Sequence, residues 1–209
     1  MEAHLAKTDA MLLATIVCMQ AGLAQLYCKT HKIYPWVPRL LFWLGLSFAM
    51  LIKGPVAPCL AFLTLGWICW KERSLWPLGA IQPLPWLLVP LLTVGPWLLS
   101  IQMLSQGNYL QSSIGQDFLA KIVEGQESHG APPGTYLLIT PFLLWPASWL
   151  LIPQAWAGLK RSSAALTSAT QFLCAWLVPN WILLELVPTK LPHYVLPLVP
   201  SLCLLAGIG

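Results

Sequence analysis

Apolar residues dominate the chain in long runs, which short polar or charged stretches separate. A helix needs about 20 apolar residues to cross the hydrocarbon core of a membrane, and fewer where flanking side chains reach the interface. Backbone groups at that depth must pair within their own segment, so helices are the favoured form. The spacing of the charges predicts seven membrane-spanning helices, over residues 10–28, 36–53, 54–70, 82–103, 135–156, 164–187 and 191–209. The predicted fold is therefore all-α: one polytopic transmembrane domain over residues 1–209, with helices broken or kinked by some of its 19 prolines.

One long polar segment, residues 104–134, interrupts this pattern and is expected to form a loop with structure of its own. Apolar residues recur in it at helical spacing, on one face of a predicted helix over 114–124: Ile114, Phe118, Leu119 and Ile122. We expect this short amphipathic helix to lie in the membrane interface. The HGAPPG sequence that follows predicts a rigid turn into the next span.

The composition supports a membrane protein and excludes other classes. Hydrophobic residues make up 57% of the chain and charged residues 9%, whereas soluble domains carry about 25% charged residues. The net charge of +4 comes from bases scattered among the loops, so no nucleic-acid partner is predicted. The six cysteines lie in or beside apolar runs without metal-ligand spacing, and we interpret them as packing residues.

The charges are distributed unequally between alternate loops. The predicted loops 28–39, 70–75 and 157–163 hold seven bases and one acid, whereas the opposite side holds four bases and six acids. Because membrane proteins keep an excess of Lys and Arg on the cytoplasmic side, the basic loops are predicted to be cytoplasmic. The outward side then carries the candidate chemical groups: Asp9, Lys53, the segment 104–134 and the stretch from Lys190 to Tyr194.

Each outward-facing residue has a structural and a functional interpretation. Asp9 could cap the first span, or it could be a general base or a ligand for a metal ion or phosphate. Lys53 could simply extend to the interface from the end of an apolar run. Lys190 stands between Pro188 and Pro192, which fix the backbone, and a cation on a rigid turn suits a phosphate ligand.

Together, these residues predict an anion site that also contains a base. His129 lies beside the rigid HGAPPG turn and adds a further cation to the same face. A pyrophosphate or phosphodiester substrate presented by a lipid would fit such a site. The alternative is a non-catalytic membrane protein, either an inactive remnant or a lipid or transport subunit. Transporters place polar groups near the bilayer midplane, so the placement at one face favours a surface-facing site.

Four sequence blocks resemble successive segments of a known family: AKTDAMLLA, LIKGP, KIVEGQESHGAPPGTYLL and TKLPHYVLPLVPSLCLLAG. The family is the bacterial membrane glycosyltransferases of the GT-C fold, of the protein O-mannosyltransferase and aminoarabinose (lipid A) transferase type, glycosyltransferase family 39. The blocks follow the family's order over nearly the whole chain. The resemblance implies an inverting transfer of a sugar from a polyprenyl-phosphate donor to a lipid or protein acceptor, at the outer, periplasmic face of the cytoplasmic membrane.

The resemblance also implies roles for single residues. Asp9 corresponds to the second acidic residue of the family's active site, near the donor phosphate or a divalent metal ion. Four residues correspond to cations of the donor-phosphate site: Lys53, Lys121 (where some members have arginine), His129 and Lys190. His193 and Tyr194 are expected in the substrate pocket.

The family pattern extends beyond this chain at both ends. Its members begin with a further span and an outer loop whose Asp-Glu pair supplies the principal catalytic carboxylate, and they continue with more helices. The resemblance therefore implies an internal part of a transferase, incomplete as an isolated enzyme, to which a second chain could supply the first helix and the acidic loop.

Overall fold

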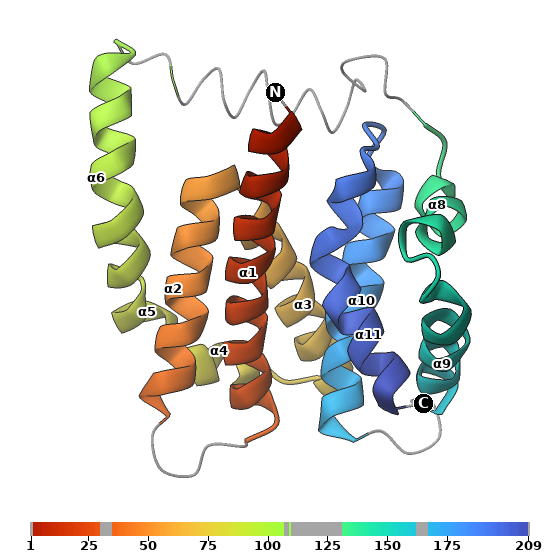
Figure 1. Ribbon diagram of the computed structural model, residues 1–209. Helices are drawn as coiled ribbons and strands as arrows, with labels where there is room; N and C mark the ends of the chain where they lie inside the picture. Colours follow the sequence, from red (N-terminus) through yellow and green to blue (C-terminus); the bar gives the residue numbers. More distant parts are fainter. Residues whose placement is uncertain (1, 30–34, 107–108, 110–130, 162–166, 209) are drawn as a thin grey trace.

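Every element that the structure describes is a helix (Figure 1). The structure, a computed structural model, describes residues 2–29, 35–106, 109, 131–161 and 167–208. In chain order the helices are α1 (Glu2–Tyr27), α2 (Trp36–Lys53), α3 (Val56–Glu72), α4 (Trp76–Ile81), α5 (Pro83–Trp86), α6 (Leu88–Leu104), α8 (Thr135–Leu143), α9 (Ser148–Arg161), α10 (Ser168–Leu186), the 3-10 helix η2 (Pro192–Leu198) and α11 (Val199–Ile208).

The long helices lie side by side, and the chain reverses direction at two ends of the molecule (Figure 1). The upper end in Figure 1 carries the start of α1, the turn between α2 and α3, and the turn that follows α10. The lower end carries the last turns of α1, α3 and α9. The lower end therefore includes the bases Lys29, Arg39 and Lys71, and the upper end includes Lys53. This is the separation of bases between two sides that the loop charges predict.

Four helices in the described part of the chain are long and apolar enough to cross a membrane: Thr8–Tyr27, Trp36–Lys53, Pro83–Leu104 and Ser168–Leu186. They coincide with four of the predicted spans, 10–28, 36–53, 82–103 and 164–187. The chain is thus an all-α polytopic membrane protein, as its hydropathy predicts.

The other three predicted spans are helical but shorter or interrupted, so the predicted number of seven is not confirmed. Helix α3 contains 17 residues. The predicted span 135–156 is divided into α8 and α9 by a break at residues 144–147, which contains Pro146. The predicted span 191–209 begins with η2 before α11 continues it. Proline removes a backbone donor and clashes with the preceding turn, which accounts for the break at Pro146. In contrast, α6 and α10 continue through Pro96 and Pro179.

Two glycines bring α1 and α2 into close contact. A Cβ atom on Gly22 of α1 would approach the carbonyl oxygen of Pro38 to 2.5 Å and the amide nitrogen of Phe42 to 2.7 Å. In turn, a Cβ atom on Gly45 of α2 would lie 2.6 Å from the amide nitrogen of Met19. Small residues at an interface let two backbones approach closely, which favours helix association within a membrane. The contact holds the lower half of α1 against the first half of α2.

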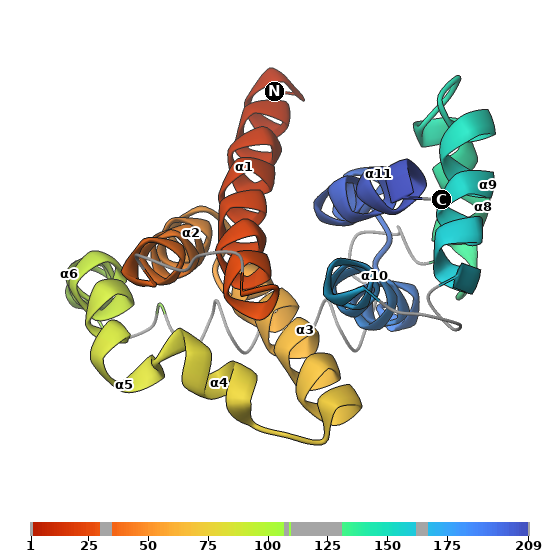
Figure 2. The ribbon, with the colours of Figure 1, turned by 90° about the horizontal axis from the view of Figure 1, so that it is seen from below.

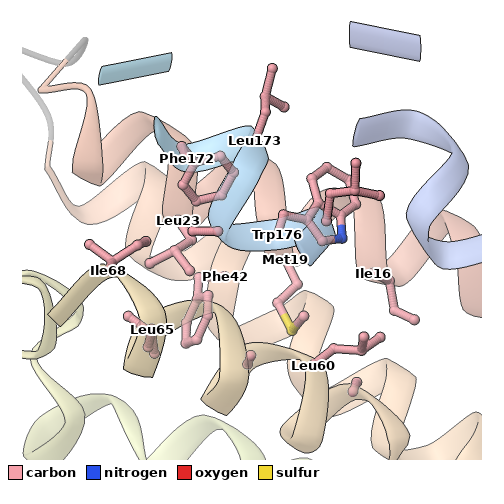
Figure 3. Close-up of a cluster of buried hydrophobic side chains, with 14 of the residues drawn as sticks. Ile16, Met19, Leu23, Phe42, Leu60, Leu65, Ile68, Phe172, Leu173 and Trp176 are labelled. Atoms are coloured by element: carbon pink, nitrogen blue, oxygen red, sulfur yellow. The ribbon is translucent and has the colours of Figure 1, made fainter. Parts of the chain in front are cut away.

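Helix α1 occupies the middle of the helix arrangement. Seen from below, it lies between α2 and the pair formed by α10 and α11, whereas α6 and α9 lie at opposite flanks (Figure 2). Buried apolar side chains of α1, α2, α3 and α10 form one core (Figure 3). Its members include Ile16, Met19, Leu23, Phe42, Leu60, Leu65, Ile68, Phe172, Leu173 and Trp176.

A polar junction lies inside this apolar core. The amide nitrogen of Gln20 in α1 donates to the Thr64 hydroxyl of α3 at 3.2 Å, and the amide nitrogen of Asn180 in α10 donates to the same hydroxyl at 3.2 Å. The Thr64 hydroxyl in turn donates to the carbonyl oxygen of Leu60 at 2.8 Å. All three polar residues are fully buried. Because buried polar groups need partners, this junction favours one register of the three helices over others.

Candidate active site

An ion pair joins α1 and α2 at the upper end. The Lys53 ammonium contacts the Oδ1 atom of Asp9. Lys53 is the last residue of α2, and Gly54 ends that helix at a φ of 58°, a conformation that suits glycine. The Asp9 side chain is 11% exposed and the Lys53 side chain 32% exposed. The pair is therefore closed on the side of Asp9 and partly open on the side of Lys53.

These contacts bear on the structural interpretations of both residues. Helix α1 begins at Glu2, so Asp9 lies within the helix rather than at its start, and the interpretation of Asp9 as an N-cap does not hold. Lys53 does not simply extend toward the interface, because the Asp9 carboxylate holds its ammonium group. The structure thus places a partly buried ion pair at the upper end of α1 and α2.

The 3-10 helix η2 brings two further side chains to this pair. The Nε2 atom of His193 lies 3.7 Å from the Oδ2 atom of Asp9. The Tyr194 ring packs edge-on against the His193 ring at a centroid distance of 4.9 Å, and the Lys53 ammonium lies 5.5 Å from the centroid of the Tyr194 ring. Asp9, Lys53, His193 and Tyr194 thus form one group, which we call the Asp9 cluster, from three segments distant in sequence.

The charges of the Asp9 cluster are arranged around one carboxylate. Burial lowers the pKa of His193, the Asp9 carboxylate opposes this shift, and the Lys53 ammonium favours it. The imidazole is therefore neutral at pH 7 and can accept a proton. The cluster combines a cation that an anionic ligand can reach, a carboxylate, and a neutral base beside it.

Lys190 lies in a different environment, although it is only three residues from His193. Its side chain is 2% exposed. Its ammonium donates to the carbonyl oxygens of Leu184 at 3.2 Å, Glu185 at 2.7 Å and Val187 at 3.0 Å. Lys190 was predicted to bind a phosphate, but its ammonium group is already hydrogen-bonded to the carbonyl groups at the end of α10.

Glu185 is the acidic partner of Lys190, and the sequence did not single it out. Its Oε2 atom lies 3.6 Å from the Lys190 ammonium. The same carboxylate accepts hydrogen bonds from the amide of Gly134 at 2.8 Å and from the amide of Leu137 at 3.0 Å, at the start of α8. A carboxylate satisfies the unpaired amides of a helix N-terminus and complements its dipole. The sequence feature that could have indicated this contact is the rigid HGAPPG turn, because the helix that follows it begins with amides that need an acceptor.

Two predicted phosphate ligands, Lys121 and His129, lie outside the described residues, as does the predicted amphipathic helix 114–124. The part of the chain that the structure describes contains no group of three or more His, Cys, Asp and Glu side chains that could hold a metal ion. Asp9 and His193 are two candidate ligands, but a divalent ion at Asp9 would have to displace the Lys53 ammonium. The described residues therefore do not fit the divalent metal that was considered from the sequence.

The chain is similar to curated arabinosyl transferases. It is 27% identical over 230 residues to undecaprenyl phosphate-alpha-4-amino-4-deoxy-L-arabinose arabinosyl transferase 1 of Pseudomonas fluorescens, covering 92% of this chain and 38% of that protein. It is 30% identical over 179 residues to the corresponding transferase of Pseudomonas aeruginosa, covering 81% of this chain and 31% of that protein. No protein-family model matches. The chain thus spans about a third of the length of the curated relatives it matches.

The fold is similar to part of a solved structure. ArnT from Cupriavidus metallidurans bound to undecaprenyl phosphate superposes with a TM-score of 0.80 at 18% identity, over 96% of this chain and 36% of that chain. The apo state of the same protein gives a TM-score of 0.71. The resemblance drawn from the four sequence blocks is confirmed by these relatives and this fold. The expectation of a second chain finds no support in them.

Proposed function

We propose that this chain forms the part of a membrane glycosyltransferase that binds the phosphate of a polyprenyl-phosphate-linked sugar, and that the Asp9 cluster is the binding site. The observation that carries the proposal is the partly open Lys53–Asp9 pair at the upper end of two apolar helices. The similarity to arabinosyl transferases supports an undecaprenyl phosphate donor carrying 4-amino-4-deoxy-L-arabinose. The acceptor in this proposal is a lipid, of the lipid A type.

The chemistry of the donor suits the position of Lys53. A polyprenyl chain dissolves in the hydrocarbon core, so its phosphate lies at the membrane surface. Lys53 ends an apolar helix and directs a partly exposed ammonium toward that level. An ammonium carries three donors and acts as a point charge toward phosphate. It can therefore contact a phosphate oxygen and keep its contact with Asp9.

The Asp9 cluster can assist the transfer at both ends of the reacting bond. The bond between the anomeric carbon and the phosphate oxygen breaks, and its electron pair passes to the phosphate, whose charge the Lys53 ammonium stabilises. The acceptor oxygen forms a bond to the same carbon and releases its proton. Asp9 is the carboxylate in the cluster that can take this proton, with His193 beside it. Inversion follows because the acceptor attacks opposite the leaving phosphate.

The proposed site faces the periplasm. The end opposite the Asp9 cluster carries Lys29, Arg39, Lys71 and Arg73, and such an excess of bases favours the cytoplasmic side. The site then lies on the outer leaflet of the cytoplasmic membrane.

Binding of undecaprenyl phosphate to the detergent-purified chain tests the proposal. Lys53→Ala is expected to weaken binding about tenfold or more, because a charge-assisted contact contributes about 1.5–3 kcal/mol. Lys71→Ala is the matched control, since Lys71 stands in the last turn of α3 at the opposite end and is exposed. Equal binding by the wild type and Lys53→Ala would refute the assignment of the phosphate site.

A further inference from the structure

Two prolines, one within the turn between α10 and η2 and one directly after it, each remove a backbone donor. Pro188 and Pro192 lack an amide hydrogen, so neither can close the turn by a regular backbone hydrogen bond. The carbonyl groups of the last turn of α10 have no partner within that helix. The Lys190 ammonium replaces the missing donors, because its three N–H groups meet the three carbonyl oxygens of Leu184, Glu185 and Val187.

The same turn is attached to the start of α8 at several points. The Tyr136 hydroxyl accepts from the amide of Leu191 at 3.1 Å and lies 3.2 Å from the carbonyl oxygen of Leu191. The amide of Ala131 donates to the carbonyl oxygen of Pro188 at 3.2 Å. The Lys190 ammonium also lies 5.1 Å from the centroid of the Tyr136 ring.

Lys190 and Glu185 are opposite charges placed at opposite helix ends. The ammonium lies at the carbonyl end of α10, and the carboxylate lies at the amide end of α8. Each charge therefore complements a helix dipole, and the two also attract each other at 3.6 Å. We call Lys190, Glu185 and Tyr136 the turn clamp.

We propose that the turn clamp is a positioning device: Lys190 and Glu185 hold the turn that presents His193 and Tyr194 to Asp9, without contacting the substrate themselves. The effect of the turn clamp on catalysis rests on the proposed function. The geometric basis of the turn clamp is independent, because Leu191, which the clamp fixes, directly precedes η2. Lys190 is buried, so it acts on the Asp9 cluster through the backbone of this turn.

The clamp accounts for the position of a lysine in an apolar stretch. A phosphate ligand at this position would have to be withdrawn from three carbonyl groups and a carboxylate before it could reach a substrate. Lys53, by contrast, is partly exposed and needs no such rearrangement. Lys53 and Lys190 thus have separate roles, Lys53 toward the ligand and Lys190 toward the chain.

The titration of His193 tests the proposal in the ligand-free, detergent-solubilised protein. NMR of ¹³C-labelled histidine follows the imidazole, and His193→Gln assigns its signal. The groups facing His193 are Asp9, Lys53 and Tyr194. Lys190→Met keeps the length of the side chain and removes its donors. We expect the His193 pKa to rise toward its ordinary value in Lys190→Met, because the imidazole is less buried, and to stay as in the wild type in Lys190→Arg.

Glu185→Gln is the second variant, because it keeps an acceptor for the α8 amides and removes only the charge. It should move the His193 pKa in the same direction by a smaller amount. A wild-type titration in both Lys190→Met and Glu185→Gln would overturn the proposal. A second result would also overturn the proposal: Lys190→Met keeps the wild-type His193 titration but no longer binds undecaprenyl phosphate. Lys190 would then be a direct ligand of the phosphate. If Lys53→Ala binds the lipid normally, the proposed function fails, but the titration still decides the role of the clamp.

Discussion

Lys53 and Asp9 form an ion pair across α1 and α2, although 44 positions separate them in the sequence. An anionic ligand at this pair is attracted by one partner and repelled by the other. The two side chains should therefore have opposite effects on binding, which a simple structural ion pair would not produce.

Replacing Asp9 separates binding from transfer. Asp9→Asn keeps the shape of the side chain and removes the negative charge, so the affinity for undecaprenyl phosphate should rise by about threefold, in line with the modest energy of a partly exposed pair. Sugar transfer, measured in a chain that carries the complete transferase, should fall by at least about a hundredfold, because the proton acceptor is lost. Weaker binding by Asp9→Asn would contradict this role.

The contact between α1 and α2 depends on two glycines. Gly45→Ala places a Cβ atom against the backbone of Met19 and should destabilise the protein by about 1–3 kcal/mol, as overpacking does. Gly66→Ala in α3 is the control, because an added Cβ meets no atom within 4 Å there. Thermal unfolding in detergent should show a lower midpoint for Gly45→Ala alone. Equal midpoints would mean that the two helices separate without cost.

The polar junction in the core should respond to loss of a single hydroxyl. Thr64→Val preserves the shape but leaves the buried amides of Gln20 and Asn180 without their shared acceptor, which should cost about 1–2 kcal/mol. Thr93→Val in α6 provides the comparison, because its hydroxyl donates to the carbonyl oxygen of Val89 in its own helix. Unfolding in increasing denaturant measures both. A larger effect at Thr93 would argue against the junction as a link between helices.

The state of His193 makes stability depend on pH. Its folded-state pKa is lowered, so in the interval below about 6.5 the unfolded chain binds a proton that the folded chain does not. Stability contributed by the neutral imidazole is complete above that interval, decreases as the pH falls through it, and levels off below the folded pKa. The unfolding midpoint of the wild type should therefore fall more steeply than that of His193→Gln as the pH is lowered from 7. Parallel curves would show that His193 does not titrate differently on folding.

Much of the fold and part of the site follow from sequence patterns. The charge distribution placed Asp9, Lys53, His193 and Tyr194 on one side, and the structure brings these four side chains into one cluster. The alternating direction of successive helices accounts for this clustering, because it brings residues of different helices to the same end of the bundle, where they can meet.

The role of Lys190 could not be predicted in the same way. Its partners are mainly backbone carbonyl groups, which carry no sequence signature, and Glu185 was counted only as one charge among several. The predicted number of spans is not confirmed for a related reason. Hydropathy measures the length of an apolar run, whereas a break such as that at Pro146 depends on local backbone geometry.

The Asp9 cluster has a consequence for how the protein is made. A ribosome produces α1 and α2 before η2, so Asp9 and Lys53 can pair as soon as α2 has entered the bilayer. Early pairing neutralises two charges that would otherwise remain single at the edge of the hydrocarbon core. His193 and Tyr194 emerge later, when α1 and α2 are already in place. The order of translation therefore assembles the salt bridge before the side chains that complete the cluster around it.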